Sequence, residues 1–76
     1  MSELSMAFGQ LVRKHRKEKN ISQERLALLC NIDRSYMGRI ERGEVNITLE
    51  KIYEIAQALE IDILDLMPTI SRHNKK

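Results

Sequence analysis

The segment 33–42, with the sequence DRSYMGRIER, holds the side chains best suited to bind another molecule. On a helical wheel at 100° per residue, Met37 and Ile40 lie on one side and Tyr36 lies at its edge. The opposite arc, about 140° wide, collects Arg34, Ser35, Gly38, Arg39 and Arg42. A guanidinium group can donate two hydrogen bonds to guanine O6 and N7, a pairing worth about 1–3 kcal/mol of discrimination. The pattern predicts a helix that packs on the rest of the protein with one face. The other face would present hydrogen-bond donors to another molecule, beside a glycine without a side chain.

Charged residues are distributed unevenly along the chain, although its net charge is only +2. Residues 10–20 contain five basic side chains and one acidic side chain, whereas residues 46–67 contain five acidic and one basic. This polarity favours an anionic partner on one side of the protein only. For the basic run RKHRK at 13–17, a solvated helix face is favoured over a contact with the partner.

The chain lacks the residue combinations of a metal site or an enzyme. Cys30 is the only cysteine, and His15 and His73 are well separated, which excludes the usual four-ligand zinc site. There is no glycine-rich phosphate loop, and 76 residues leave little volume for a substrate pocket. We therefore expect no enzymatic activity and no cofactor. Cys30 fits a core position as a small hydrophobic residue, with a redox role as the alternative.

Helical spacing and turn residues predict where the elements begin and end. Phe8, Leu11, Val12 and His15 recur at helical spacing and predict a first helix over about 4–19. Asn20 ends this helix, because asparagine tolerates the left-handed conformation of many helix exits. His15 is interpreted as a packing residue rather than a pH switch.

Four later helix starts share one pattern, in which an isoleucine precedes a capping residue and an apolar residue follows four positions after the cap. This is the hydrophobic staple with an N-cap oxygen. The four sets are Ile21-Ser22 with Leu26, Ile32-Asp33 with Met37, Ile47-Thr48 with Ile52, and Ile61-Asp62 with Leu66. They predict helices over about 22–30, 33–42, 48–59 and 62–67, the last ended by Pro68.

These elements define an all-α fold of five helices in a single domain, residues 1–76. The compact core spans about 4–67, and 68–76 is expected to be a flexible tail. No stretch approaches the roughly 20 apolar residues of a membrane span, and the polar start MSELS does not look like a signal peptide. We expect a cytoplasmic protein that does not enter membranes.

The short connection at Asn31-Ile32, with small Ala27 where the two helices approach, describes a helix-turn-helix. The run ISQERLALLCNIDRSYMGRIERG at 21–43 resembles the phage repressor and Cro-type helix-turn-helix family, through S-Q-E-x-L-A and the closing I-E-x-G. The resemblance covers roughly residues 8–66. Within the family, DRSYM, IERG and the small size look like the controller proteins of restriction–modification systems. Two departures are Asn31, where glycine is most common, and His15, where an aliphatic residue is usual.

The resemblance implies a sequence-specific transcriptional regulator that binds double-stranded DNA, with autoregulation by activation and repression. The start of the recognition helix reaches base edges, which assigns base reading to Arg34 and Ser35, with Tyr36 beside them. Arg39, one turn further along, is the next candidate. Phosphate binding falls to Gln23 and, as weaker candidates, to Arg42, Asn46 and Lys51. Arg42 could equally cap its helix. Arg16 and Glu41 resemble a pair that ties the first helix to the third, with two exposed residues as the alternative.

The last predicted helix has more apolar residues than one buried face of so short a helix can hold. Some of them are therefore expected to be exposed in a monomer, which favours a protein partner. A symmetric homodimer on a palindromic operator is the simplest arrangement, with recognition helices about 34 Å apart. The predicted interface is Tyr53, Leu59, Ile61, Ile63, Leu64 and Met67. The alternative is that these residues complete a marginal core.

Other functions of the same fold remain open at this point. They are a phage or chromosomal repressor, an antitoxin, and a protein-interaction module that does not bind DNA. RNA polymerase is a further partner that the resemblance implies, through the acidic Glu24, for which helix-dipole stabilisation is the alternative.

Overall fold

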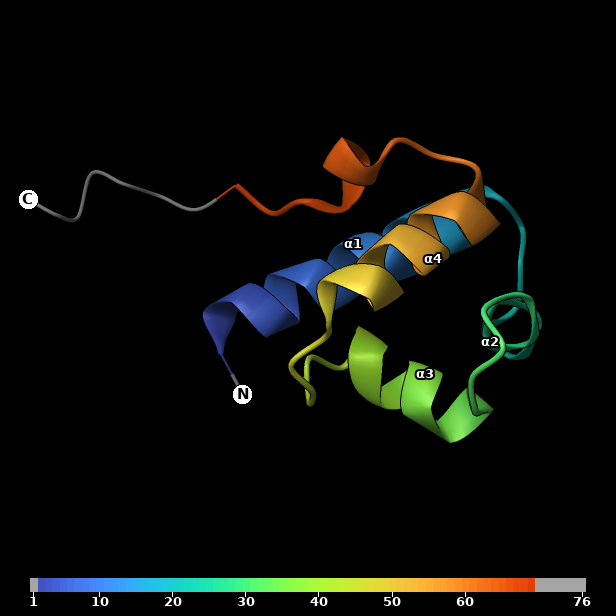
Figure 1. Cartoon of the computed structure of the whole chain (residues 1–76), viewed down its shortest axis with the longest axis horizontal. Coiled ribbons are helices and arrows are strands. Elements are labelled where there is room, and N and C mark those ends of the chain that lie inside the picture. Colours follow the sequence, from blue (N-terminus) through green and yellow to red (C-terminus); the bar gives the residue numbers. More distant parts are fainter. Residues whose placement is uncertain (1, 70–76) are drawn as a thin grey trace, which may run out of the picture.

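Four α-helices and one 3-10 turn form the regular structure of residues 2–69, the part of the chain that this computed structural model describes (Figure 1). The elements are α1 (Glu3–Glu18), α2 (Gln23–Leu29), α3 (Arg34–Glu41), α4 (Leu49–Leu59) and η1 (Ile63–Leu66). No strand occurs in this range, which confirms the all-α prediction. None of the described helices is long and apolar enough to cross a membrane.

The fifth predicted helix, 62–67, is wrong in type, because only the 3-10 turn η1 forms there. Asp62 caps it by accepting the Leu64 N–H at 2.9 Å. A residue before proline is pushed out of the helical region, and Met67, before Pro68, is extended with φ −87° and ψ 114°. The turn therefore has no room to become an α-helix. Of the predicted tail 68–76, residues 70–76 lie outside the described range.

Each α-helix ends in a residue with positive φ: Asn20 (59°), Asn31 (58°), Gly43 (76°) and Glu60 (58°). Asn20 was expected to accept this conformation, and Asn31 stands where glycine is most common, whereas Glu60 was not identified. After three of these residues comes an isoleucine whose N–H returns to the helix just ended, as Ile32 N–H does to Ala27 O at 3.0 Å. Ile21, Ile32 and Ile61 thus close one helix and precede the cap of the next element. Because one isoleucine takes part in both the end of a helix and the start of the next element, the loops between these elements are short.

The core lies where α1 and α4 pass over α2 and α3 (Figure 1). Its largest fully buried side chains come from all five elements: Val12, Leu26, Met37, Ile40, Ile55, Leu59 and Leu66. The assignment of Leu59 to a dimer interface is therefore wrong, because its side chain is only 1% exposed. Leu59 follows Ile55 by one helical turn and shares its inward face, whereas Tyr53 points outward and is 56% exposed.

Two glycines let α1 approach α3 closely: Gly43, which ends the I-E-x-G motif, and Gly9, which sequence reasoning did not single out. A Cβ on Gly9 would lie 2.6 Å from the backbone oxygen of Glu41, and one on Gly43 would lie 2.6 Å from the Cα of Met6. Both obstacles are backbone atoms that cannot rotate away. The position of α3 on the domain therefore depends on the absence of a side chain at these two sites.

We expect Gly9→Ala to destabilise the fold by about 1–3 kcal/mol, the usual cost of overpacking. Helix propensity alone predicts the opposite sign, since alanine favours a helix by up to about 1 kcal/mol over glycine. Urea unfolding followed by circular dichroism measures the difference, with exposed Gln10→Ala on α1 as the matched control. A Gly9→Ala protein more stable than its parent would contradict the close contact of α1 with α3.

Candidate nucleic-acid interface

The outward face of α3 carries the side chains that the sequence assigned to base reading. Arg34, Ser35 and Arg39 are exposed and Tyr36 is half-buried. Met37 and Ile40 are buried, at 0% and 1% exposed, and attach the opposite side of α3 to the core. In Figure 1, α3 lies along the lower edge of the molecule, with no described element beyond it. The only acidic residue within α3 is Glu41, which is buried and paired, so the exposed face of this helix has no negative side chain.

Gly38 differs from the bare backbone patch that the wheel predicts, because neighbouring side chains cover it. A Cβ at this position would lie 3.1 Å from Arg42 Nη1 and 3.4 Å from Gln23 Oε1. The glycine makes room for a guanidinium from the end of α3 and an amide from the start of α2. Two of the four predicted phosphate ligands, Gln23 and Arg42, thus converge on one spot over α3.

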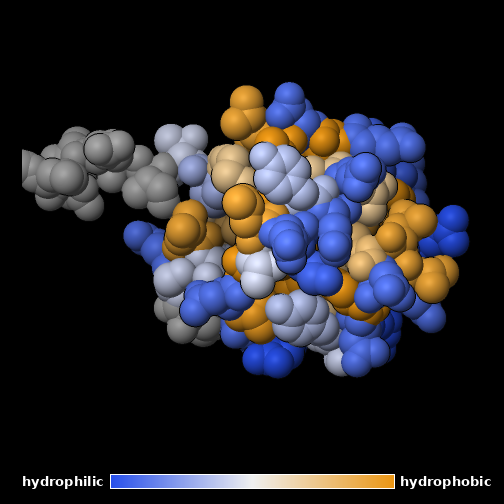
Figure 2. Space-filling view, in the orientation of Figure 1, coloured by the Kyte–Doolittle hydropathy of each residue, from blue (hydrophilic) through white to orange (hydrophobic). Residues whose placement is uncertain are grey.

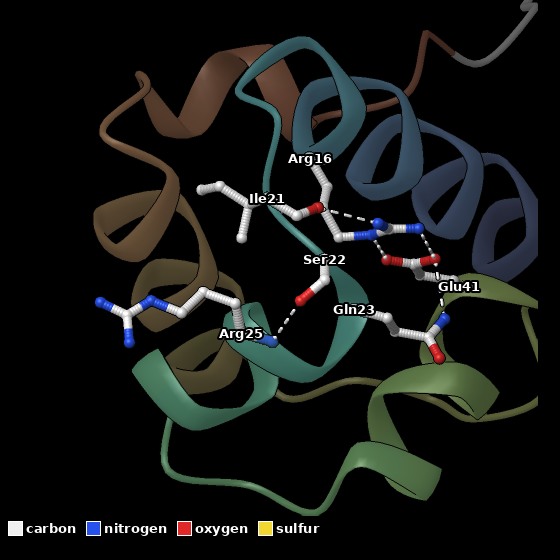
Figure 3. Close-up of polar contacts among 6 residues, drawn as sticks. All are labelled: Arg16, Ile21, Ser22, Gln23, Arg25 and Glu41. Atoms are coloured by element: carbon white, nitrogen blue, oxygen red, sulfur yellow. Dashed lines mark hydrogen bonds and ion pairs between the residues drawn. The ribbon is translucent and has the colours of Figure 1, made fainter.

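A largely buried ion pair joins three helices behind this surface (Figure 3). Arg16 of α1 donates from Nε to Glu41 Oε2 at 2.6 Å and from Nη2 to Oε1 at 3.1 Å. Its Nη1 donates to the backbone oxygen of Ile21 at 2.9 Å. The structure therefore contains the Arg16–Glu41 bridge that the sequence favoured, in a bidentate geometry that adds strength and direction.

The same carboxylate also holds Gln23, a contact that sequence reasoning missed. Gln23 Nε2 donates to Glu41 Oε1 at 3.1 Å, so the first residue of α2 is tied to the last residue of α3. Because an amide nitrogen has two N–H donors, one donor of Gln23 remains for another acceptor. Ala27, the small residue predicted between the two helices, is buried at 2% exposed.

Arg39 and Arg42 share one acidic partner, Glu44, just after α3. Arg42 donates to Glu44 from Nε at 2.8 Å and from Nη2 at 3.3 Å, while Arg39 Nε lies 3.9 Å from Glu44 Oε1. The hydrogen bond from Arg42 lowers the pKa of the Glu44 carboxyl, and the same bond raises the pKa of the Arg42 guanidinium. All three side chains are exposed enough to meet a ligand.

The remaining predicted phosphate ligands, Asn46 and Lys51, do not join this group. Asn46 Oδ1 accepts a hydrogen bond from Ser5 Oγ at 3.3 Å, at the rim of an apolar hollow that includes Phe8. Lys51 Nζ forms an ion pair with Glu54 at 3.1 Å and lies in a separate hollow beside Cys30. These two residues therefore line different hollows rather than one common site.

Cys30 and His15 both occupy packing positions. Cys30 is 6% exposed, and burial raises the pKa of its thiol, which keeps the sulfur protonated and unreactive. The His15 side chain is 17% exposed, with Nδ1 3.4 Å from Glu18 Oε1. No group of three or more metal-ligating side chains occurs within the described residues.

A second surface lies on the side of α4 and η1. Leu64 is 71% exposed, Tyr53 is 56% exposed and Met67 is 37% exposed. Ile61 and Ile63 are half-buried and line a shallow hollow with Tyr53. Figure 2 shows several hydrophobic side chains among hydrophilic ones at the top of the view, where Figure 1 has η1. We refer to these five residues as the α4–η1 patch.

The chain matches the model of a protein family described as helix-turn-helix over residues 12–66. It therefore belongs to the helix-turn-helix family and is a DNA-binding transcription regulator. Two relatives that are similar to it in sequence indicate which kind of regulator within this family it resembles. The chain is 42% identical to control protein C.BamHI of Bacillus amyloliquefaciens, over 87% of this chain and 83% of the relative. It is 34% identical to control protein C.MunI of a Mycoplasma species, over 95% and 99% of the two chains.

Solved structures agree with this assignment. The restriction–modification controller protein C.AhdI from Aeromonas hydrophila superposes with a TM-score of 0.79 and 45% identity, covering 82% of this chain and 94% of that one. Both resemblances stated from the sequence, to the helix-turn-helix family and to its controller proteins, are confirmed.

Proposed function

We propose that this chain regulates transcription as a homodimer that binds an inverted-repeat operator, with α3 in the major groove. The observation that carries the proposal is the division of α3 into a buried apolar side and an exposed side rich in arginine. The controller proteins to which the chain is similar support the same class of regulator. The function is binding without chemical conversion of the DNA.

Arg34 and Ser35 are the proposed base-reading residues, with Tyr36 and Arg39 beside them. Arg34 and Ser35 are the first two residues of α3 and are exposed, and this end of a recognition helix is the part that reaches base edges. Arg39 lies further along the same side, and its position close to Glu44 points it toward the C-terminal end of α3.

Gln23 and Arg42 are the proposed phosphate ligands next to the groove. They approach each other over Gly38, and Glu41 holds the Gln23 amide in place. Such contacts fix the register of the protein on the duplex without reading its sequence. Asn46 and Lys51 stay candidates at the periphery, since each already has an intramolecular partner.

The α4–η1 patch is the proposed dimer interface. Exposed apolar side chains gathered on one side of a small domain favour a protein partner, and a second copy is the simplest one. Two-fold symmetry would set the two α3 helices about 34 Å apart, one turn of duplex. Glu24, exposed in the first turn of α2, is the candidate contact with RNA polymerase at promoters that the dimer activates.

Arg34→Ala is expected to weaken operator binding by about 1–3 kcal/mol and to relax the choice of base at one position of each half-site. The reason is the loss of a guanidinium that can pair with guanine in two places. Fluorescence anisotropy with the operator and with single-base variants measures both effects. Arg25→Ala, which removes an exposed arginine of α2, is the matched control. Equal weakening on every sequence would show that Arg34 binds phosphate instead of a base.

A further inference from the structure

Glu44 places a negative charge among the arginines of the proposed DNA-binding surface. Its carboxylate accepts two hydrogen bonds from Arg42 and lies 3.9 Å from Arg39 Nε. Arg42 is a proposed phosphate ligand and Arg39 a proposed base reader. A single acidic side chain therefore engages two residues that DNA is expected to need.

The backbone keeps this carboxylate at the end of α3. Glu44 N–H donates to Arg39 O at 2.9 Å, and Gly43 N–H donates to Ile40 O at 3.0 Å. Gly43, with a φ of 76°, completes this helix-ending motif. Rotation about side-chain bonds can move the carboxylate off the arginines, but the residue itself stays beside α3.

Carboxylate and phosphate compete for the same edge of a guanidinium. Both groups accept the paired N–H donors of arginine in a bidentate geometry. Glu44 already occupies Nε and Nη2 of Arg42, while Nη1 lies over Gly38, where Gln23 also converges. A phosphate that approaches the Gln23–Arg42 site therefore meets an arginine whose favoured edge is taken.

We propose that Glu44 is a built-in competitor of the DNA phosphate at Arg42, which lowers the affinity of the protein for all DNA sequences. The proposal rests on the proposed function and deepens it. In the free protein Glu44 neutralises the two arginines, and in the complex a phosphate replaces it. An exposed ion pair alone is weak, but the repulsion between the displaced carboxylate and the phosphate adds to its effect.

Glu44→Gln is expected to tighten binding about three- to tenfold at about 150 mM salt, on the operator and on random duplex alike. The effects are equal because phosphates carry no sequence information. The salt dependence should steepen by up to about one unit, since the displaced carboxylate of the parent takes up a cation from solution and offsets one released counterion, which the glutamine does not. Glu60→Gln is the matched control, because it removes the same charge from the end of α4 that lies away from α3 (Figure 1).

A double-mutant cycle separates competition from general repulsion. If Glu44 acts through Arg42, Glu44→Gln should have a clearly smaller effect in the Arg42→Ala background than in the parent protein. Weaker binding by Glu44→Gln would instead show that Glu44 positions Arg42, and it would overturn the proposal. An effect no larger than that of Glu60→Gln, or one unchanged by Arg42→Ala, would overturn it as well.

Phosphocellulose chromatography tests the competition without an operator. Glu44→Gln should elute at higher salt than the parent and than Glu60→Gln, because Arg42 and Arg39 are free to bind the phosphate groups of the matrix. If the parent binds no duplex at all, the proposed function fails, while late elution of Glu44→Gln still supports competition. Identical elution of the two variants overturns the competition itself.

Discussion

Glu41→Ala is expected to destabilise the protein by about 3–5 kcal/mol, the usual result of leaving one partner of a buried ion pair alone. Glu41 is 6% exposed and accepts three hydrogen bonds, two from Arg16 and one from Gln23. Without it, the Arg16 guanidinium is buried with only the backbone oxygen of Ile21 as a partner. Because the pair joins α1 to α3 and α2, the loss affects the whole domain.

Urea unfolding measures this destabilisation, with exposed Glu18→Ala as the control expected within about 0.5 kcal/mol of the parent. A second variant, Arg16→Met with Glu41→Leu, tests the cause. Apolar replacement of both charges is often close to neutral, so the pair of substitutions should recover most of the loss. A Glu41→Ala protein as stable as the parent would contradict the structural role of the bridge.

Leu64→Glu is expected to convert the dimer into monomers and to weaken operator binding by about 10²- to 10⁴-fold, the usual range of avidity in a two-site complex. Leu64 is 71% exposed in the α4–η1 patch, and burying an unpaired carboxylate in an apolar interface is costly. Sedimentation equilibrium reports the mass, and titration of a two-half-site duplex reports the affinity.

Leu28→Glu is the matched control for oligomeric state, because Leu28 is 68% exposed but lies on α2, outside the patch. It should remain a dimer. Retention of the dimer by Leu64→Glu would move the interface to another surface, whereas monomers that bind the operator as tightly as the parent would remove dimerisation from the mechanism.

Local sequence patterns were sufficient to predict most helix boundaries. A capping side chain and the apolar residues around it lie within one turn, so their geometry follows from short-range contacts. Ser22 accepts the N–H of Arg25 at 2.9 Å, and Thr48 accepts that of Lys51 at 3.2 Å. The capping bond predicted for Asp33 is wrong, because its side chain accepts no N–H of α3, although the helix still begins there. The division of α3 into two sides could be predicted for the same reason, since a helix repeats every 3.6 residues.

Contacts between distant residues could not be predicted from periodicity. Nothing local marks Gly9 as the place where α1 meets the backbone of α3, or Gln23 as a partner of Glu41. The surroundings of Gly38 depend on side chains from two elements, which a single-helix wheel omits. Leu59 was assigned to the interface as an extension of the apolar last segment along the preceding helix, whereas tertiary packing turns its side chain inward.

Selection of bound fragments from a random duplex library at about 150 mM salt tests the proposed function most directly. The expected result is an enriched inverted repeat whose half-sites are centred about one helical turn apart. The same selection with Arg34→Ala should lose preference at one position of each half-site. A folded parent protein that enriches no sequence, and binds DNA only weakly and in a salt-sensitive way, would contradict operator recognition by α3.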